Sequence, residues 1–373
     1  MKQVVISGTG LYTPTQSISN DELVESFNSY VNSYNESHKD EIEAGSVDAL
    51  AESSSAFIEK ASGIKSRYVM DKAGILDPTS MKPYLPERSN YEPSIQCEMA
   101  VTAAKEALAQ AGKTIEDVDA VIVACSNLQR AYPAIAVEVQ TALGINGFAY
   151  DMNVACSSAT FGIQSAVSAV QTGAARCVLM LNPEICSGHL NFRDRDSHFI
   201  FGDACTAVII ESAETATSEH QYEVLGSKLQ TVFSNNIRNN AGFLNHCDES
   251  GLGKTDKLFV QNGRKVFKEV CPMVAKQITA HLEELDLTAG NLKRMWLHQA
   301  NLSMNQLIAK RVLGRPAEVE EAPVILDTYA NTSSAGSVIA YHLYKDDIQS
   351  GDIGVICSFG AGYSIGSVII KKI

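Results

Sequence analysis

The chain repeats a short pattern, and this repeat constrains its fold more than any other feature of the sequence. Asp151–Ala159 and Asp327–Ala335 are similar nine-residue segments, and each follows a short apolar run and opens a helical pattern. The two helical patterns end alike, at Gln171-Thr-Gly173 and Gln349-Ser-Gly351, and an apolar segment follows each ending. Because four elements recur in the same order, we interpret the chain as two similar halves rather than two units that share only composition.

Strand-like and helix-like segments alternate in both halves. Short apolar runs indicate buried strands at Val4–Ser7, Ala120–Ala124, Phe148–Met152, Cys177–Leu181, Ala207–Ile210, Met295–Leu297, Gly354–Cys357 and Val368–Ile370. Helices are expected at Glu98–Ala111, Ser157–Thr172, Phe267–Leu285 and Ser303–Leu313. The alternation predicts an α/β protein with helices packed on sheets, its first half spanning residues 1–212 and its second half residues 221–373.

Two stretches of the first half do not fit the repeat. Residues 28–55 are rich in Asn, Ser, Glu and Tyr, and residues 71–93 hold four of the ten prolines. We expect both to be surface insertions, and a long ordered segment of this kind more often serves as a lid or an interface than as an idle connection.

Charge and cysteine content argue against several classes of protein. The 373 residues carry a net charge of −13, which disfavours nonspecific binding to nucleic acid or to an anionic membrane. No run approaches the ~18 apolar residues of a membrane-spanning helix, and the first residues lack the features of a signal peptide. Nine cysteines without a C-x-x-C pair do not support a zinc or dithiol site. We therefore expect a cytoplasmic protein with reduced thiols.

Three residues occupy positions where such a fold gathers functional groups. Cys156 lies between an expected strand and the following helix, where the helix dipole and free N–H groups favour a thiolate. The repeat places Asn331 at the equivalent junction of the second half, and His298 ends a strand. Each alone has a structural explanation, as a buried thiol, a helix cap or a core histidine. Together they predict one site at the axis relating the two halves.

In these motifs the sequence resembles the 3-oxoacyl-[acyl-carrier-protein] synthase III family of the thiolase superfamily. The resemblance rests on Asn-Val-Ala-Cys156-Ser-Ser, His298-Gln-Ala-Asn and Ala-Asn331-Thr-Ser-Ser-Ala, and it covers most of the chain outside the insertions. Phe201-Gly-Asp, the segment Gln261–Lys268 and the loop Phe359–Ser367 support it. It implies an α/β thiolase fold of five layers, α-β-α-β-α, built from two pseudo-symmetric halves and assembled as a homodimer.

The resemblance also implies a condensing acyltransferase that initiates fatty-acid synthesis and needs no metal or organic cofactor. Cys156 takes an acyl group from an acyl-CoA primer, and the backbone N–H groups of Cys156 and Ala361 hold the oxyanion. Malonyl-acyl carrier protein then loses CO2, and His298 and Asn331 donate hydrogen bonds to the resulting enolate. Attack of the enolate on the acyl-cysteine gives a 3-oxoacyl-acyl carrier protein.

The residues implied to bind substrate depart in part from the family pattern. Phe57 aligns with a tryptophan of the pantetheine tunnel, and Tyr132 with a phenylalanine that crosses the dimer interface to close the partner's acyl pocket. Ser303 replaces an arginine that docks the carrier protein. The other implied substrate-binding residues are Arg264, Phe267, Lys268 and Asn301. A basic patch for an acidic carrier could instead come from Arg264, Lys265, Lys268, Lys310, Arg311 and Arg315, or these charges form an ordinary solvated face.

Other members of the superfamily fit less well. Ketosynthases I and II carry a second histidine where this chain has Asn331, and biosynthetic thiolases need a second cysteine that the loop 359–363 lacks. A related acyltransferase of specialised metabolism, with another acyl donor or acceptor, stays open as an alternative. A carrier-binding protein without condensation is disfavoured, because a binder has no need of a decarboxylation site. The sequence leaves the primer and its chain length open.

Overall fold

The structure, a computed structural model, describes residues 2–239 and 258–373, so Cys247 lies outside the described residues. The strands are β1 (Val4–Tyr12), β2 (Gln16–Ser19), β3 (Ser66–Val69), β4 (Ala120–Ala124), β5 (Phe148–Met152), β6 (Cys177–Ile185), β7 (Asp203–Ser212), β8 (Tyr222–Ser234), β9 (Ile237–Arg238), β10 (Val260–Gln261), β11 (Leu292–Leu297), β12 (Ile353–Gly360) and β13 (Gly362–Lys372). The α-helices are α1 (Asn20–Ser37), α2 (Lys39–Glu43), α3 (Ser55–Ser62), α4 (Lys72–Leu76), α5 (Ile95–Ala111), α6 (Ile135–Leu143), α7 (Ser158–Thr172), α8 (Gly263–Glu284), α9 (Leu302–Leu313), α10 (Leu326–Tyr329) and α11 (Ala335–Leu343).

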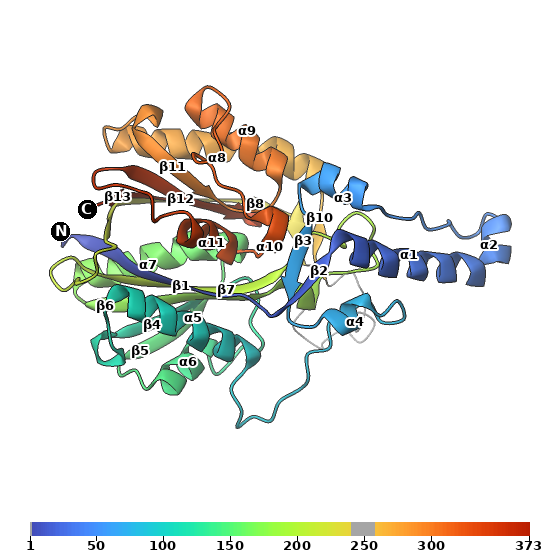
Figure 1. The fold of residues 1–373 in the computed structure, drawn as a ribbon, viewed down its shortest axis with the longest axis horizontal. Coiled ribbons are helices and arrows are strands. Elements are labelled where there is room, and N and C mark those ends of the chain that lie inside the picture. The colour runs from blue at the N-terminus through green and yellow to red at the C-terminus, as the bar shows by residue number, and fades with distance from the viewer. Residues whose placement is uncertain (1, 240–257) are drawn as a thin grey trace.

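Five layers stack in the body of the molecule (Figure 1). One sheet has the strand order β1-β7-β6-β4-β5 and the other the order β8-β13-β12-β11, and a short pairing of β1 with β8 joins them. Helices α7 and α11 lie between the sheets and contact both. Helices α5 and α6 cover the outer face of the first sheet, and α8 and α9 that of the second. The α-β-α-β-α order expected from the resemblance is confirmed.

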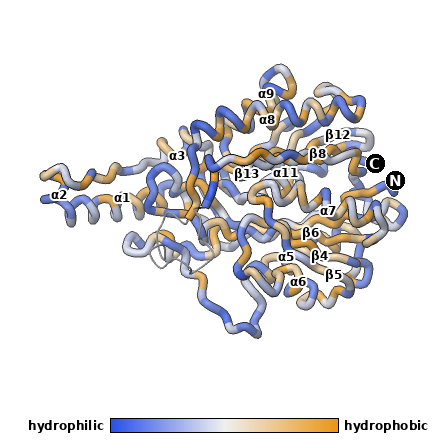
Figure 2. The backbone as a smooth tube through the Cα atoms, turned by 180° about the vertical axis from the view of Figure 1, so that it is seen from behind, coloured by the Kyte–Doolittle hydropathy of each residue, from blue (hydrophilic) through white to orange (hydrophobic). Residues whose placement is uncertain are grey.

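The central helices are held by apolar packing against both sheets, and Figure 2 shows apolar residues concentrated in the strands around them. In α7, Ile163, Val167 and Val170 are buried in one cluster with strands of both halves. Burying a side chain such as Ile163 stabilises the fold by ~1.5–3 kcal/mol, so this packing fixes where α7 begins and where Cys156 lies. Among the described residues, no helix combines the length and apolar character needed to cross a membrane.

Every predicted strand and helix is present, and most extend beyond their predicted bounds. Helix α8 begins four residues earlier than predicted because the Asn262 side chain caps it, accepting a hydrogen bond from the backbone N–H of Lys265. A 3₁₀ turn, Ala155–Ser157, precedes α7. Cys156 therefore lies in a turn just before the helix, as predicted.

Residues 20–54 form an arm that projects from the body (Figure 1). Helix α1 starts with a capping box, in which Ser19 and Glu22 each accept a hydrogen bond from the other's backbone N–H. Three asparagines along α1 then hold the returning segment through side-chain hydrogen bonds. The pairs are Asn28–Ser53, Asn32–Glu52 and Asn35–Leu50. The first insertion thus consists largely of helix α1 and the segment that runs back along it. Its polar composition did not predict this helix.

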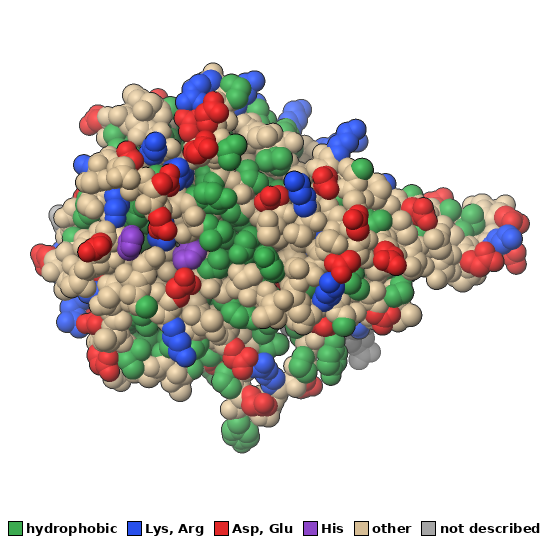
Figure 3. All heavy atoms as spheres, viewed as in Figure 1, with side chains coloured by type: hydrophobic (Ala, Val, Ile, Leu, Met, Phe, Trp, Pro, Cys, Tyr) green, Lys and Arg blue, Asp and Glu red, His purple; other side chains and the backbone are tan. Residues whose placement is uncertain are grey.

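The arm also holds most of the excess negative charge. Residues 20–54 contain nine acidic side chains and one basic side chain, Lys39. Five of the nine acidic residues lie within residues 36–48, at the tip, where Figure 3 shows acidic side chains gathered. The rest of the chain is therefore left with a net charge of −5 out of −13.

The second insertion, residues 71–93, has little regular structure. It contains α4, and beyond that helix the chain leaves the body as an extended loop (Figure 1). Tyr84 and Tyr91 on this loop are exposed. Ile75 and Met81 of the same segment are buried, so only part of it lies on the surface, and its role as a lid or an interface stays a prediction.

Candidate active site

Cys156 stands in the turn between β5 and α7, where the two halves of the chain meet. Ala155, directly before it, has a left-handed φ of 48°. The sulfur of Cys156 lies 3.4 Å from the hydroxyl of Ser333. A Cβ added at Gly360 would lie 2.6 Å from the Cβ of Cys156, so only glycine leaves room for this approach. Ser333 and Gly360 both belong to the second half, which therefore forms part of the surroundings of the sulfur.

Cys156 is a thiol at neutral pH, and the predicted stabilised thiolate is wrong. Burial raises the pKa of this thiol to about 11. The Ser333 hydroxyl and the backbone N–H groups of Cys156 and Ala361 lower the pKa, while the charge of Glu184 raises it further. The prediction of a thiolate considered only the helix dipole and the free N–H groups. It left out the free-energy cost of removing a charged thiolate from water, which raises the pKa. The nucleophile therefore needs a group that takes its proton.

His298 follows β11 directly and is buried against Phe359. The two ring centroids lie 5.2 Å apart at 88°, and the backbone N–H of His298 donates to the carbonyl of Cys357. Burial lowers the pKa of His298 to about 4, although a backbone hydrogen bond with Ser333 acts in the opposite direction. The ring is therefore neutral at pH 7 and has one N–H donor and one acceptor nitrogen. Its Nδ1 atom has no hydrogen-bond partner among the described residues.

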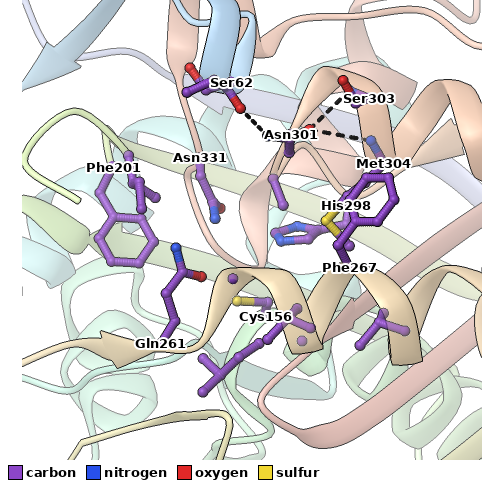
Figure 4. A pocket seen from close by; sticks show the side chains of 18 of the residues that line it. Ser62, Cys156, Phe201, Gln261, Phe267, His298, Asn301, Ser303, Met304 and Asn331 are labelled. Carbon is purple, nitrogen blue, oxygen red and sulfur yellow. Dashed lines mark hydrogen bonds between the residues drawn. The ribbon is translucent and has the colours of Figure 1, made fainter. Parts of the chain in front are cut away.

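Asn331 is held so that its amide nitrogen stays available. Its backbone N–H donates to the carbonyl of Ile200 at 2.9 Å, and its carbonyl accepts from the N–H of Gly202 at 3.1 Å. Its side-chain Oδ1 accepts from the backbone N–H of Ser333 at 2.8 Å. Figure 4 shows the remaining amide nitrogen pointing into the pocket. Asn331 thus presents an N–H donor to whatever occupies this space.

One pocket of about 660 Å³ contains Cys156, His298 and Asn331 (Figure 4). Three of the residues expected to bind substrate also line it, and these are Arg264, Phe267 and Asn301. Phe201, Phe359 and Met304 add apolar walls. A largely apolar pocket that ends at a thiol suits a long, flexible acyl thioester.

The other three residues expected to bind substrate do not line this pocket. The guanidinium of Arg195 lies 4.1 Å above the ring of Phe57, whose edge contacts Phe199 at the pocket wall. Lys268 is exposed on α8, and Tyr132 is 85% exposed. Roles in substrate binding for these three residues stay predictions.

Asn301 also organises the rim of the pocket. Its Oδ1 accepts from the backbone N–H groups of Ser303 and Met304, which caps α9, and its Nδ2 donates to the carbonyl of Ala61 at 2.7 Å. Figure 4 shows the bonds to the helix start. Ser303, which stands where the family has an arginine, therefore lies in the first turn of α9 at the rim.

Two parts of the site were not predicted. Ser333 contacts Cys156, His298 and Asn331, and the run of hydroxyl residues after Asn331 was the available signal. Phe259, beside the short ribbon of β9 and β10, lines the pocket and packs edge-on against Phe201 at 4.7 Å. No local pattern marks Phe259, because its contact partners are distant in sequence.

The arrangement suits acyl transfer followed by chemistry on an enolate. A thiol provides a nucleophile, and two backbone N–H groups lie beside it for an oxyanion. Neutral His298 and the Asn331 amide line the same space and can donate to a thioester oxygen without adding a charge.

Comparisons with known proteins agree on the family. Residues 150–232 match the family described as 3-Oxoacyl-[acyl-carrier-protein (ACP)] synthase III, and residues 282–372 match its C-terminal part. A beta-ketodecanoyl-[acyl-carrier-protein] synthase of Pseudomonas aeruginosa is 70% identical over 349 residues, 94% of this chain and 100% of that protein. A beta-ketoacyl-[acyl-carrier-protein] synthase III of Granulibacter bethesdensis is 28% identical over 100% of both chains.

Solved structures share the fold over the whole chain. The 3-oxoacyl-[acyl-carrier-protein] synthase III from Aquifex aeolicus has a TM-score of 0.76 at 23% identity and covers 99% of both chains. The priming beta-ketosynthase of the R1128 polyketide pathway has a TM-score of 0.78 at 21% identity, covering 99% of this chain and 96% of that one. With a relative 70% identical over almost its full length, the chain belongs to the beta-ketoacyl-[acyl-carrier-protein] synthase III family of the thiolase superfamily, the condensing acyltransferases of fatty-acid synthesis.

Proposed function

We propose that this enzyme condenses an eight-carbon acyl-CoA with malonyl-acyl carrier protein, giving 3-oxodecanoyl-acyl carrier protein and CO2. The 70% identity to a beta-ketodecanoyl-[acyl-carrier-protein] synthase carries the proposal. Decarboxylative condensation adds two carbons to the primer, so a ten-carbon product requires an eight-carbon primer. Synthesis would then start from a medium-chain primer rather than a short one.

In the first half-reaction, the Cys156 sulfur attacks the thioester carbonyl of the acyl-CoA. The thiol proton must leave, and His298, which is neutral at pH 7, can accept it and return it to the departing CoA sulfur. The backbone N–H groups of Cys156 and Ala361 stabilise the oxyanion of the tetrahedral intermediate. The products are acyl-Cys156 and free CoA.

In the second half-reaction, malonyl-acyl carrier protein occupies the same pocket. The C–C bond to the carboxylate breaks, CO2 leaves, and the electron pair forms an enolate on the thioester. Asn331 Nδ2 and an N–H of His298 donate hydrogen bonds to the enolate oxygen. The enolate carbon then attacks the carbonyl of acyl-Cys156, the C–S bond breaks, and the departing sulfur takes a proton from solvent, which is the one proton that the overall reaction consumes.

Intact-mass analysis after incubation with acyl-CoAs of two to twelve carbons tests the primer. We expect octanoyl-CoA to acylate Cys156 at least about tenfold faster than acetyl-CoA, since each buried methylene contributes ~0.8 kcal/mol. Cys156→Ala is the control and should show no acylation. Fastest acylation by acetyl-CoA would contradict the medium-chain proposal and would leave the condensing reaction in place.

We also propose that the carrier protein docks on the exposed cationic side chains of α8 and α9. Arg264 lines the pocket, Lys268 is exposed one turn further along α8, and Arg311 lies near the end of α9. Arg315 is less available, because both of its terminal nitrogens bind Glu321.

The docking proposal predicts a selective effect on one substrate. Lys268→Glu together with Arg311→Glu should raise the KM for malonyl-acyl carrier protein several-fold at low salt and leave acylation by acyl-CoA unchanged. The effect should shrink at higher salt, since exposed charges are screened over ~8 Å at physiological ionic strength. Lys39→Glu, on the arm, is a control for a single charge reversal away from this surface, and it is compared with Lys268→Glu alone. An unchanged KM in the double variant would exclude this docking surface.

A homodimer is proposed through the open edge of the first sheet. Strand β5 lies at that edge, and its Phe148 and Tyr150 are 42% and 38% exposed, with ring centroids 6.5 Å apart. An edge strand with exposed aromatic side chains favours pairing with a second copy. Light scattering should give twice the mass of the chain, and Phe148→Asp should lower it toward the monomer. A monomeric wild type would contradict the proposal.

We propose the cytoplasm as the place of action. The described cysteines are all free, as a reducing compartment requires. An in-vivo thiol-trapping experiment that finds Cys156 accessible and reduced in the cytoplasmic fraction would support this proposal, whereas recovery of the enzyme from an oxidising compartment would contradict it.

A further inference from the structure

A buried carboxyl group lies beside the site but outside the pocket. Glu184, near the end of β6, is fully buried, and none of the described lysines or arginines forms an ion pair with it. Burial raises its pKa, and hydrogen bonds from serine hydroxyls and backbone N–H groups act in the opposite direction. Neither of the two proposed half-reactions uses the Glu184 carboxyl group.

Two serines, one from each half of the chain, donate hydrogen bonds to the carboxylate oxygens of Glu184. Ser126, which follows β4, donates from its backbone N–H at 2.9 Å and from its hydroxyl at 2.6 Å. Ser334 donates from its backbone N–H at 3.1 Å and also from its hydroxyl. Glu184 therefore fixes Ser334, in the second half, to the end of a strand in the first half.

Ser334 closes the turn that carries Asn331. Within this turn, Ala330 and Ser333 have positive φ values of 55° and 49°, which residues other than glycine rarely adopt. Such a backbone persists only where its surroundings hold it. Glu184 holds the last residue of the turn, directly after Ser333.

Ser333 in turn connects all three residues of the site. Its backbone N–H donates to Asn331 Oδ1, its hydroxyl lies 3.4 Å from the Cys156 sulfur, and its backbone hydrogen-bonds to His298. A shift of the turn would therefore rotate the Asn331 amide and disturb His298, while the thiol would remain on its own turn in the first half.

We propose that Glu184 is a positioning residue, which holds the turn 330–334 so that Asn331 Nδ2 and His298 face the thioester oxygen during decarboxylation. Glu184 touches neither substrate nor sulfur, and it acts through Ser334 and Ser333. The inference rests on the proposed function, because it assigns Asn331 and His298 to the decarboxylation step.

Glu184→Ala should lower the rate of malonyl-acyl carrier protein decarboxylation at least tenfold without lowering iodoacetamide alkylation of Cys156, because loss of the Glu184 charge removes one cause that raises the pKa of this thiol. Glu184→Gln should recover most of the lost rate. Its amide oxygen can still accept from Ser334 and from the Ser126 N–H, and its NH2 group can donate to the Ser126 hydroxyl. A merely structural role would lower both rates together with the melting temperature.

Glu211 supplies a matched control, since it is a fully buried carboxyl that binds Ser7 and Lys113 and does not line the pocket. Glu211→Ala should lower stability without a selective loss of decarboxylation. If Glu184→Ala fails to fold, Ser334→Ala replaces it, with the same selective loss but a smaller one. Wild-type decarboxylation in a folded Glu184→Ala, or in Ser334→Ala, would overturn the inference. A wild-type enzyme that cannot decarboxylate malonyl-acyl carrier protein would instead contradict the proposed function.

Discussion

The turns that carry Cys156 and Asn331 have the same place in the two halves, yet they present different chemistry. Each follows an alanine with positive φ, 48° at Ala155 and 55° at Ala330. In the first turn, the side chain is a thiol, and the backbone N–H groups of Cys156 and of Ala361, which comes from the second half, lie beside its sulfur. In the second turn, a backbone N–H orients the side chain, leaving its amide nitrogen as a donor.

This difference shows how one duplicated turn can serve two half-reactions. The first turn, as proposed, supplies a nucleophile and one of the two N–H groups of the oxyanion hole, and the second supplies a donor to the enolate. If this division holds, each turn can be disabled while the other continues to work.

Cys156→Ala should abolish acyl labelling and condensation, because no other described cysteine lines the pocket. Malonyl-acyl carrier protein decarboxylation should continue, since the second turn is untouched. Peptide mapping after acyl-CoA treatment and CO2 release measure the two outcomes. An acyl label on Cys357 or another cysteine would contradict the assignment of the nucleophile.

Asn331→Ala should slow decarboxylation by about 10²–10³, corresponding to the ~2.7–4 kcal/mol lost with one hydrogen-bond donor to a developing oxyanion. Acylation of Cys156 should fall much less. Asn331→Asp sharpens the test, because its carboxylate can still accept from the Ser333 N–H but has no N–H to donate. Wild-type decarboxylation in Asn331→Asp would show that the amide nitrogen has no part in this step.

Alkylation of Cys156 by iodoacetamide should accelerate about tenfold per pH unit between pH 7 and 9. The pKa of the thiol is raised to about 11, so the reactive thiolate fraction grows tenfold with each unit below that value. His298, with a pKa of about 4, stays neutral throughout this range and adds no step to the profile. A rate that levels off below pH 8 would show that the pKa of Cys156 is low, and it would support the thiolate predicted from the position of Cys156 at the helix start.

Ala330→Gly should raise the free energy of unfolding by ~1 kcal/mol, because φ 55° with ψ −154° lies where alanine is strained and glycine is not. Ala155→Gly serves as the comparison, because Ala155 has a similar positive φ at the equivalent place in the first half. Chemical denaturation measures both. Equal changes in the two variants would mean that the turns store the same strain.

Local patterns were enough to predict the elements of the fold and the three residues at the pocket floor. The repeat and the helix ends, such as Gly173, are readable within a few residues. The raised pKa of the Cys156 thiol could not be predicted from local patterns, because it depends on burial by segments that are distant in the sequence. The bonds from Glu184 to Ser334 and from Ser333 to Cys156 join residues about 150 and 177 positions apart, so no local pattern encodes them.

The acidic arm changes what the net charge of −13 means for an approaching partner. Helix α1 has 18 residues and a length of about 27 Å, so the charges at its tip lie several screening lengths from its base at physiological salt. A partner seated on the body meets the field of a chain whose charge outside the arm is only −5. At low ionic strength the same separation of charge gives the molecule a large electric dipole. That dipole would turn the enzyme in solution, before contact, so that an acidic partner arrives on the side away from the arm.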